Sequence, residues 1–250
     1  MNSIYETVAE SIPQPKLLFM NYGFSSPGLE DSWIQAADTP FRLHLNLIRH
    51  LLAGVDLCGK SVLEIGCGRG GNCYYLSRYT EASRIVGLDL CASNLASARG
   101  HSALQRVEFI AGDAQRLPFA GGRFDVVLNL ESSHCYNDFE KFVAEAAHVL
   151  KSRGIFCFAD LWNVDRLELD WQARRQALSC SQMEIIAEEN ISEQVFRAIA
   201  QPGNICEQLD ALADAKSRPL IDRIIRSAKA LQAGLATGDY SYRLWKMRKL

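Results

Sequence analysis

Short apolar segments alternate with longer amphipathic segments between about residues 60 and 160 of this chain. Each short segment can form a buried strand, and polar or glycine-rich residues bound it. The expected strands are 61–65, 84–89, 107–110, 124–129 and 154–160. Between the last two, apolar side chains recur every three or four residues, which is typical of a helix with one buried face. This alternation predicts an α/β fold with a parallel, doubly wound sheet and helices on both faces.

The N-terminal part carries no strand pattern. Residues 1–40 contain several prolines and glycines and predict an irregular or partly helical arm. Thr39 and Pro40 then match a helix N-cap and a first helical position, and apolar residues continue at helical spacing to about Gly54. We therefore expect an arm and one amphipathic helix before the sheet.

The C-terminal part indicates that the sheet is interrupted late. A candidate sixth strand precedes a mostly helical stretch, and 240–247 alternates like a final strand. The helical stretch is therefore an insert before the last strand, and a candidate lid. The resulting division is 1–55 for the N-terminal arm and helix, 56–190 for the ligand-binding core, 191–236 for the helical lid insert and 237–250 for the last strand of the core sheet.

Composition and charge fit a globular protein with no general attraction to polyanions. Of the 250 residues, 48% are hydrophobic and 22% are charged, and the formal net charge is −2. Basic residues do gather over 215–250, where nine lysines and arginines meet two acids. This segment predicts either a solvated helix face or a contact with an anionic group on a substrate.

The cysteines and the N-terminus indicate a reducing compartment. The eight cysteines form no Cys-x-x-Cys pair and have no histidine at zinc-finger spacing, so we expect reduced core residues and no metal site. The first residues lack a secretory signal pattern, and no apolar stretch is long enough to span a membrane. A cytoplasmic location is the expectation.

The strongest local motif is the glycine-rich loop after the first predicted strand. It carries Gly66, Gly68 and Gly70, which let the backbone turn sharply and approach a ligand closely. Ligands bind beyond the carboxyl ends of parallel strands, where this loop lies. The spacing of Gly66, Gly68 and Gly71, with Asp89 further on, also fits a dinucleotide loop.

Acidic residues at three successive strand ends favour S-adenosylmethionine over a dinucleotide. Glu64 lies two residues before the first glycine, where its carboxylate can accept a hydrogen bond from the cofactor ammonium. Asp89 ends the second strand and can bind both ribose hydroxyls. Asp113, followed by Ala114, comes after the third strand and can receive the adenine amino group. A strand-end aspartate can simply cap a helix, but three acidic residues at successive strand ends predict this cofactor.

These motifs together resemble those of the class I S-adenosylmethionine-dependent methyltransferases. The matching segments are 62–70, 87–90, 112–119 and 124–127, and 128–136 is most similar to the phthiotriol dimycocerosate methyltransferases and related natural-product enzymes. The resemblance implies a Rossmann-like, seven-stranded sheet whose last strand is antiparallel. The expected cofactor-binding residues are Glu64, Gly66, Gly68, Gly70, Asp89, Leu90, Asp113, Ala114 and Asn129.

Candidate catalytic residues follow the fourth and fifth predicted strands. Methyl transfer to a hydroxyl needs a base, and His134 lies in the loop after the fourth strand. Asp160 ends the neighbouring strand, where its carboxylate can orient the imidazole, as in sugar and polyketide O-methyltransferases that this pair resembles. Glu131 is the alternative: it can hold a loop, or act on the carbocation that an alkene acceptor would form.

Three functions are compatible with these residues. The leading hypothesis is O-methylation of a lipid-like or secondary-metabolite hydroxyl. C-methylation of an isoprenoid or its diphosphate is the second, and a binding protein or cyclase that retains the cofactor without methyl transfer is the third. A nucleic-acid substrate is not expected, because the loop after the fourth strand lacks the Asn/Asp-Pro-Pro-aromatic tetrapeptide of base-amine methylation. A homo-oligomer is compatible with the sequence.

Overall fold

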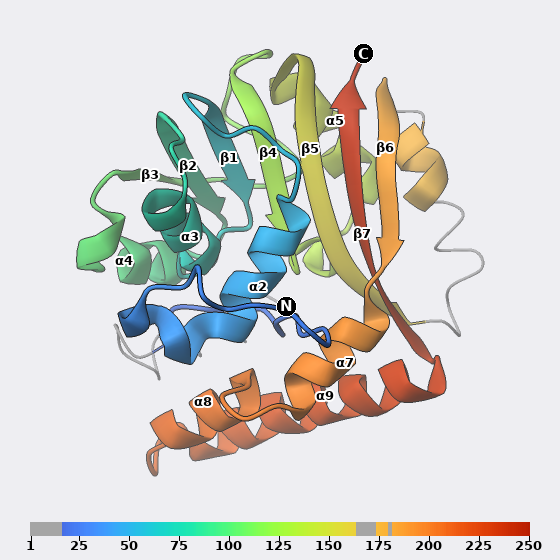
Figure 1. Cartoon of the computed structure of the whole chain (residues 1–250). Helices are drawn as coiled ribbons and strands as arrows, with labels where there is room; N and C mark the ends of the chain where they lie inside the picture. Colours follow the sequence, from blue (N-terminus) through green and yellow to red (C-terminus); the bar gives the residue numbers. More distant parts are fainter. Residues whose placement is uncertain (1–16, 164–173, 180–181) are drawn as a thin grey trace.

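The structure is a computed structural model that describes residues 17–163, 174–179 and 182–250. The first part of the expected arm, 1–16, lies outside these residues, and so does Cys180. In the described part a single sheet has the strand order β3-β2-β1-β4-β5-β7-β6, and Figure 1 shows helices in front of it and behind it. The strands are β1 (Ser61–Ile65), β2 (Arg84–Asp89), β3 (Val107–Ala111), β4 (Phe124–Leu130), β5 (Leu150–Asn163), β6 (Met183–Asn190) and β7 (Tyr240–Lys249).

Strands β1 to β5 are parallel, and β7 is antiparallel to both of its neighbours. The last strand in the sequence therefore lies inside the sheet, between β5 and β6, rather than at its edge (Figure 1). The seven-stranded α/β sheet with an antiparallel last strand is confirmed. Five parallel carboxyl ends meet at one edge, where a ligand site of this fold class is expected.

Helices cover both faces of the sheet because the strands bury both sets of alternating side chains. Leu63 and Val127 pack with Phe142 in one core cluster, whereas Val62 and Leu128 pack with Leu47 in the other. The helices are α2 (Arg42–Leu51), α3 (Gly71–Tyr79), α4 (Ala92–Arg99), α5 (Phe139–Val149), α7 (Ser192–Ala200), α8 (Ile205–Leu212) and α9 (Arg218–Thr237). No helix among the described residues is long and apolar enough to cross a membrane.

The helix start expected at Pro40 is wrong. A 3-10 turn spans Ala36–Phe41, and α2 begins only at Arg42, with no side-chain cap. The reason is Asp38, a buried residue whose carboxylate accepts hydrogen bonds from the hydroxyl of Tyr74 (2.6 Å) and Nε of Arg78 (2.7 Å) on α3. Tertiary contacts thus decide the local conformation here.

Helices α7, α8 and α9 lie along the edge of the sheet where the parallel strands end (Figure 1). Apolar residues of α8 and α9 share a core cluster with Leu17, and Tyr22 packs against it. Two polar contacts join the turn between α7 and α8 to the N-terminal part of the chain: the guanidinium of Arg42, on α2, donates to the carbonyl of Pro202 (2.7 Å), and the Gln201 amide donates to the hydroxyl of Ser25 in the arm (2.6 Å). The helical insert and the N-terminal arm therefore pack on each other beside the carboxyl ends.

Candidate active site

A cavity of about 370 Å³ lies where β1, β2 and β4 end. Its walls come from five segments that are far apart in the sequence, which is the arrangement expected at the carboxyl edge of an open parallel sheet. The lining lies within 18–22, 66–72, 88–94, 112–115 and 130–137. The glycine loop, two of the three strand-end acids and the loop after β4 therefore reach one site.

Gly66 has no room for a side chain. Its φ is +72°, and a Cβ atom there would lie 2.0 Å from Oγ of Ser132. The backbone N–H groups of Gly66 and Cys67 both donate to the carbonyl of Leu88, at 2.8 and 2.9 Å. These contacts hold the glycine loop against the ends of β2 and β4. Gly68 also lines the cavity, whereas Gly70 faces Leu104 and serves as the left-handed N-cap of α3.

Glu64 lies behind the cavity wall. It is fully buried, and its carboxylate accepts hydrogen bonds from the amide of Asn72 (2.8 Å) and the thiol of Cys73 (2.9 Å). Burial raises the pKa of Glu64 to about 7. Asn72 itself lines the cavity and Glu64 does not, so Asn72 links the Glu64 carboxylate to the cavity wall. Sequence reasoning missed Asn72, whose only signal is its place in the first turn after the loop.

Asp89 and Asp113 both line the cavity, with Leu90 and Ala114 beside them. The two carboxylate oxygens of Asp89 accept backbone N–H groups, from Gly68 at 2.7 Å and from Cys91 at 2.8 Å. Burial raises the pKa of Asp89. Oδ1 of Asp113 accepts the backbone N–H of Gln115 at 2.8 Å. Both acids are thus held in place by local turns at the strand ends.

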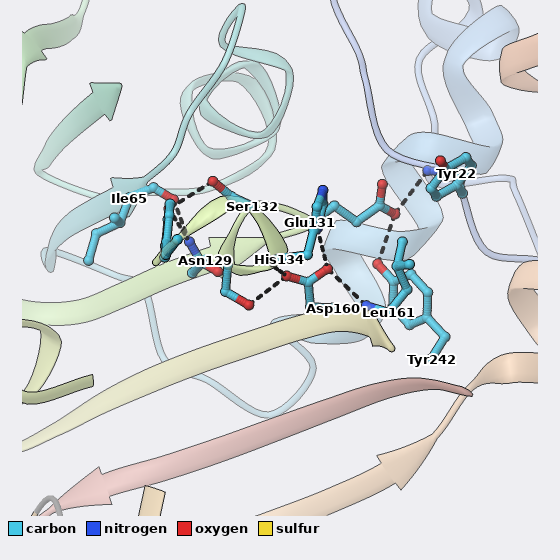
Figure 2. Close-up of polar contacts among 11 residues, drawn as sticks. Tyr22, Ile65, Asn129, Glu131, Ser132, His134, Asp160, Leu161 and Tyr242 are labelled. Atoms are coloured by element: carbon cyan, nitrogen blue, oxygen red, sulfur yellow. Dashed lines mark hydrogen bonds and ion pairs between the residues drawn. The ribbon is translucent and has the colours of Figure 1, made fainter. Parts of the chain in front are cut away.

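Asn129 is not one of the residues that line the cavity. The side chain is fully buried, and its amide donates to the carbonyl of Ile65 (2.8 Å) and to the hydroxyl of Tyr136 (3.0 Å). The Tyr136 hydroxyl is also hydrogen-bonded to Oγ of Ser132 at 2.7 Å. Figure 2 shows Asn129 beside Ile65 and Ser132. In this structure Asn129 supports the glycine loop from the neighbouring strand.

His134 and Asp160 form an ion pair at the cavity wall (Figure 2). Nδ1 of His134 lies 2.8 Å from Oδ1 of Asp160, and the histidine side chain is 32% exposed while the aspartate side chain is fully buried. The Asp160 carboxylate also accepts the Ser133 hydroxyl (2.6 Å) and the backbone N–H groups of His134 (3.0 Å) and Leu161 (2.8 Å). The buried charge is thereby fully hydrogen-bonded.

The pair shifts the pKa of both groups. The negative charge of Asp160 raises the pKa of His134 to about 11, against the opposing effect of burial. Burial alone would raise the pKa of Asp160, but the His134 charge and the hydrogen bonds from the side chains of His134 and Ser133 and from the backbone of Leu161 bring this pKa below its ordinary value. The resting pair is therefore imidazolium and carboxylate over the neutral pH range.

Glu131 lies on the same cavity wall, one residue beyond β4. Its φ is +51°, a left-handed backbone that turns the chain sharply at this point. Oε1 accepts the backbone N–H of Tyr22 (3.0 Å) and the hydroxyl of Tyr242 (2.8 Å), as Figure 2 shows. Burial raises the pKa of Glu131 to about 8. The carboxylate ties the N-terminal arm and β7 to the site.

The arm and the glycine loop contribute cavity residues that sequence reasoning did not assign. Leu18, Met20 and Asn21 line the cavity, as does Arg69, a buried residue whose pKa is lowered by burial. The only feature in the sequence that could have indicated these four residues is that they lie close to a recognised motif. Among the described residues, no group of three or more histidines, cysteines or acids could hold a metal ion.

The geometry fits a small cofactor whose amino-acid end carries an ammonium group. The glycine loop lies so close to Ser132 that Gly66 has no room for a Cβ atom, and acids stand at or directly behind the wall at three strand ends. A dinucleotide loop has no use for a buried acid such as Glu64. The donor and acceptor set therefore supports S-adenosylmethionine.

Comparisons with known proteins point the same way. A methyltransferase domain family matches residues 63–158. The chain is 33% identical to the phthiotriol/phenolphthiotriol dimycocerosates methyltransferase of Mycobacterium tuberculosis, over 98% of this chain and 90% of that protein. It is also 30% identical to the fatty-acid O-methyltransferase of Mycolicibacterium smegmatis, over 97% of this chain and 87% of that protein.

A solved structure shows the same fold. The geranyl diphosphate C-methyltransferase from Streptomyces coelicolor, in complex with Mg²⁺, geranyl diphosphate and S-adenosyl-L-homocysteine, superposes with a TM-score of 0.69. The superposition covers 99% of this chain and 98% of that chain, at 17% sequence identity. At that identity the likeness concerns the fold alone.

Proposed function

Because this chain belongs to the S-adenosylmethionine-dependent methyltransferase family that includes the phthiotriol/phenolphthiotriol dimycocerosates methyltransferases, we propose that it methylates a hydroxyl oxygen of a lipid-like or secondary-metabolite molecule. The family uses a cofactor of the S-adenosylmethionine type and small-molecule acceptors. The observation that carries the choice of oxygen is the His134–Asp160 pair in the cavity wall.

Residues on three strand ends would hold the cofactor. Glu64, acting through Asn72, is suited to the ammonium group, and Asp89 is suited to the ribose hydroxyls. Asp113, with Ala114 beside it, is suited to the adenine amino group. When bound, S-adenosylmethionine supplies a methyl group on an activated, positively charged sulfur. The task of the protein is then to align the acceptor and exclude water.

His134 is the proposed base. Nδ1 is committed to Asp160, so Nε2 is the ring nitrogen that takes the proton of an acceptor hydroxyl, and the carboxylate stabilises the imidazolium that results. The resting imidazolium must first lose a proton.

The cavity argues against a diphosphate acceptor. Diphosphates are bound by clustered arginines and lysines or by metal ions. Among the described residues that line the cavity there is no lysine, and Arg69 is the only arginine. The basic segment 215–250 contributes nothing to this lining. These observations favour a neutral oxygen acceptor over an isoprenoid diphosphate.

A carboxylate acceptor is the second candidate. The printed name of the Mycolicibacterium relative describes a fatty-acid O-methyltransferase. A carboxylate needs no base, and the raised pKa of His134 would place an imidazolium beside this anion. In that case His134 binds the acceptor electrostatically rather than taking its proton.

Product analysis tests the proposal. The enzyme is incubated with deuterated-methyl cofactor and, separately, with a long-chain alcohol, a phenol, a fatty acid and geranyl diphosphate, and tandem mass spectrometry locates the label. Label on a hydroxyl oxygen supports the proposal, and label on a carboxylate supports the second candidate. Label on carbon would contradict both. Absence of transfer to every acceptor, despite cofactor binding, would favour a binding protein or cyclase.

A further inference from the structure

A chain of hydrogen bonds links helix α8 to the proposed cofactor site. It begins at Gln208, whose amide donates to Nε2 of His44 at 3.0 Å. Because an amide N–H can only donate, Nε2 accepts and Nδ1 carries the ring proton. Nδ1 then donates to Oδ1 of Asn21 at 3.0 Å.

The chain continues from the arm into the core. The amide of Asn21 donates to Oδ1 of Asn72 at 3.3 Å, and the amide of Asn72 donates to Oε1 of Glu64 at 2.8 Å. Every donor thus points toward Glu64. We call Gln208, His44, Asn21, Asn72 and Glu64 the polar relay.

The polar relay is buried over most of its length. His44 and Glu64 are fully buried, Asn21 is 5% exposed, and the His44 ring stacks on Phe19 at 5.4 Å between centroids. Burial lowers the pKa of His44 to about 4, so the ring stays neutral and keeps its single proton. A buried polar chain adds less stability than apolar packing would, but it fixes one arrangement of its members.

The members of the polar relay belong to different elements of the fold around the cavity. Gln208 lies on α8, His44 on α2 and Asn21 in the arm, while Asn72 and Glu64 belong to α3 and β1. Asn21 and Asn72 also line the cavity. A ligand group at Glu64 and Asn72 therefore contacts one end of a chain whose other end is the helical insert.

We propose that Gln208, His44 and Asn21 are positioning residues that couple the docking of α8 on the arm to binding of the cofactor's amino-acid end at Glu64 and Asn72. This inference rests on the proposed cofactor site. Because coupling between two sites is reciprocal, binding at Glu64 tightens the docking of α8, and loss of that docking weakens binding.

The test compares two ligands and two matched variants. S-Adenosylhomocysteine carries the amino-acid end, whereas 5′-methylthioadenosine lacks it. His44→Phe keeps the ring on Phe19 but removes both nitrogens of the polar relay. Asn46→Leu is the control, since Asn46 is a buried polar residue of α2 that bonds Asp31 (2.9 Å) outside the polar relay.

Calorimetry should show that the relay variants lose affinity for S-adenosylhomocysteine but not for 5′-methylthioadenosine. In His44→Phe, affinity for S-adenosylhomocysteine falls about fivefold to tenfold, as expected for about one hydrogen bond, while affinity for 5′-methylthioadenosine is unchanged. Asn46→Leu binds both ligands as the wild type does. Gln208→Met, at a half-buried position, serves as the second variant and shows the same selectivity with a smaller loss of affinity.

Hydrogen exchange gives a readout that does not depend on activity. S-Adenosylhomocysteine should slow amide exchange in Ile205–Leu212 of the wild type and of Asn46→Leu, but not of His44→Phe or Gln208→Met. The coupling would be overturned if both relay variants kept the wild-type affinity for S-adenosylhomocysteine and the wild-type protection of α8. It would also be overturned if the variants lost affinity equally for S-adenosylhomocysteine and 5′-methylthioadenosine. A wild type that binds neither ligand would instead overturn the cofactor assignment on which the inference rests.

Discussion

Nδ1 of His134 lies 2.8 Å from Oδ1 of Asp160, although 26 positions separate the two residues. The pair forms because β4 and β5 are parallel neighbours, with Leu130 opposite Ala159 in the register. The loop after β4 therefore reaches the end of β5. This contact fixes the orientation of the imidazole and the nitrogen that faces an acceptor.

The methyl-transfer rate should rise with pH through the neutral and alkaline range. The reason is that Asp160 holds His134 as an imidazolium, which must lose its proton before it can act as a base. Asp160→Asn removes the charge, so the rise should move to lower pH, near the ordinary histidine value, while the maximal rate falls. A kcat profile of both proteins from pH 6 to pH 10 measures this. Identical profiles would contradict the pairing.

The same pair should stabilise the fold most at mildly acidic pH. The pKa of His134 is raised from 6.5 to about 11 on folding, so its contribution is complete below 6.5 and is lost as pH rises toward 11. The pKa of Asp160 is lowered from 3.8, so its contribution is present above that value and is lost in acid. The stability difference between wild type and His134→Gln should therefore be largest between these limits. Urea unfolding at several pH values measures it; a difference that grows in alkali would be incompatible.

Gly66→Ala should abolish binding of S-adenosylhomocysteine. The new Cβ would lie 2.0 Å from Oγ of Ser132 and force the loop away from β4. Gly122→Ala is the matched control, because Gly122 has a similar φ of +69° and no atom within 4 Å of a Cβ. The control should lose about 1 kcal/mol of unfolding free energy from backbone strain alone, and Gly66→Ala about 3 kcal/mol. If both variants lost the same unfolding free energy and both still bound S-adenosylhomocysteine, the close approach at Gly66 would be unimportant.

Glu131→Gln should retain most O-methyl transfer. The amide oxygen can still accept from the N–H of Tyr22 and the hydroxyl of Tyr242, so the arm and β7 stay in place. A loss below tenfold in kcat, with an unchanged melting temperature, is expected if Glu131 holds the loop. A much larger loss at unchanged stability would assign the proton transfer to Glu131 and favour carbon as the acceptor.

The sequence predicts the sheet and most of the site because both depend on residues that are close together in the sequence. Apolar runs mark the strands, and Asp89 and Asp113 are visible as strand-end acids, since a strand's last residues reach the carboxyl edge of the sheet. Adjacency of His134 and Asp160 follows once the strand order is known. The resemblance to a known family supplies that order.

Contacts between distant elements could not be predicted in this way. Gln208 and His44 are 164 positions apart, and no periodicity relates them. The burial of Asp38, which replaces the expected helix start with a 3-10 turn, depends equally on tertiary packing. Asn129 shows the same limit, because its amide donates to the carbonyl of Ile65, which is 64 positions away in the sequence.

The most direct test of the account is the transfer rate of His134→Gln at saturating cofactor, measured by mass spectrometry of the O-methylated product. The account predicts a fall in kcat of about 10²-fold to 10⁴-fold, with affinity for S-adenosylhomocysteine unchanged, because a general base contributes that much. Transfer to the same hydroxyl at the wild-type rate would contradict the assignment of His134 as the base.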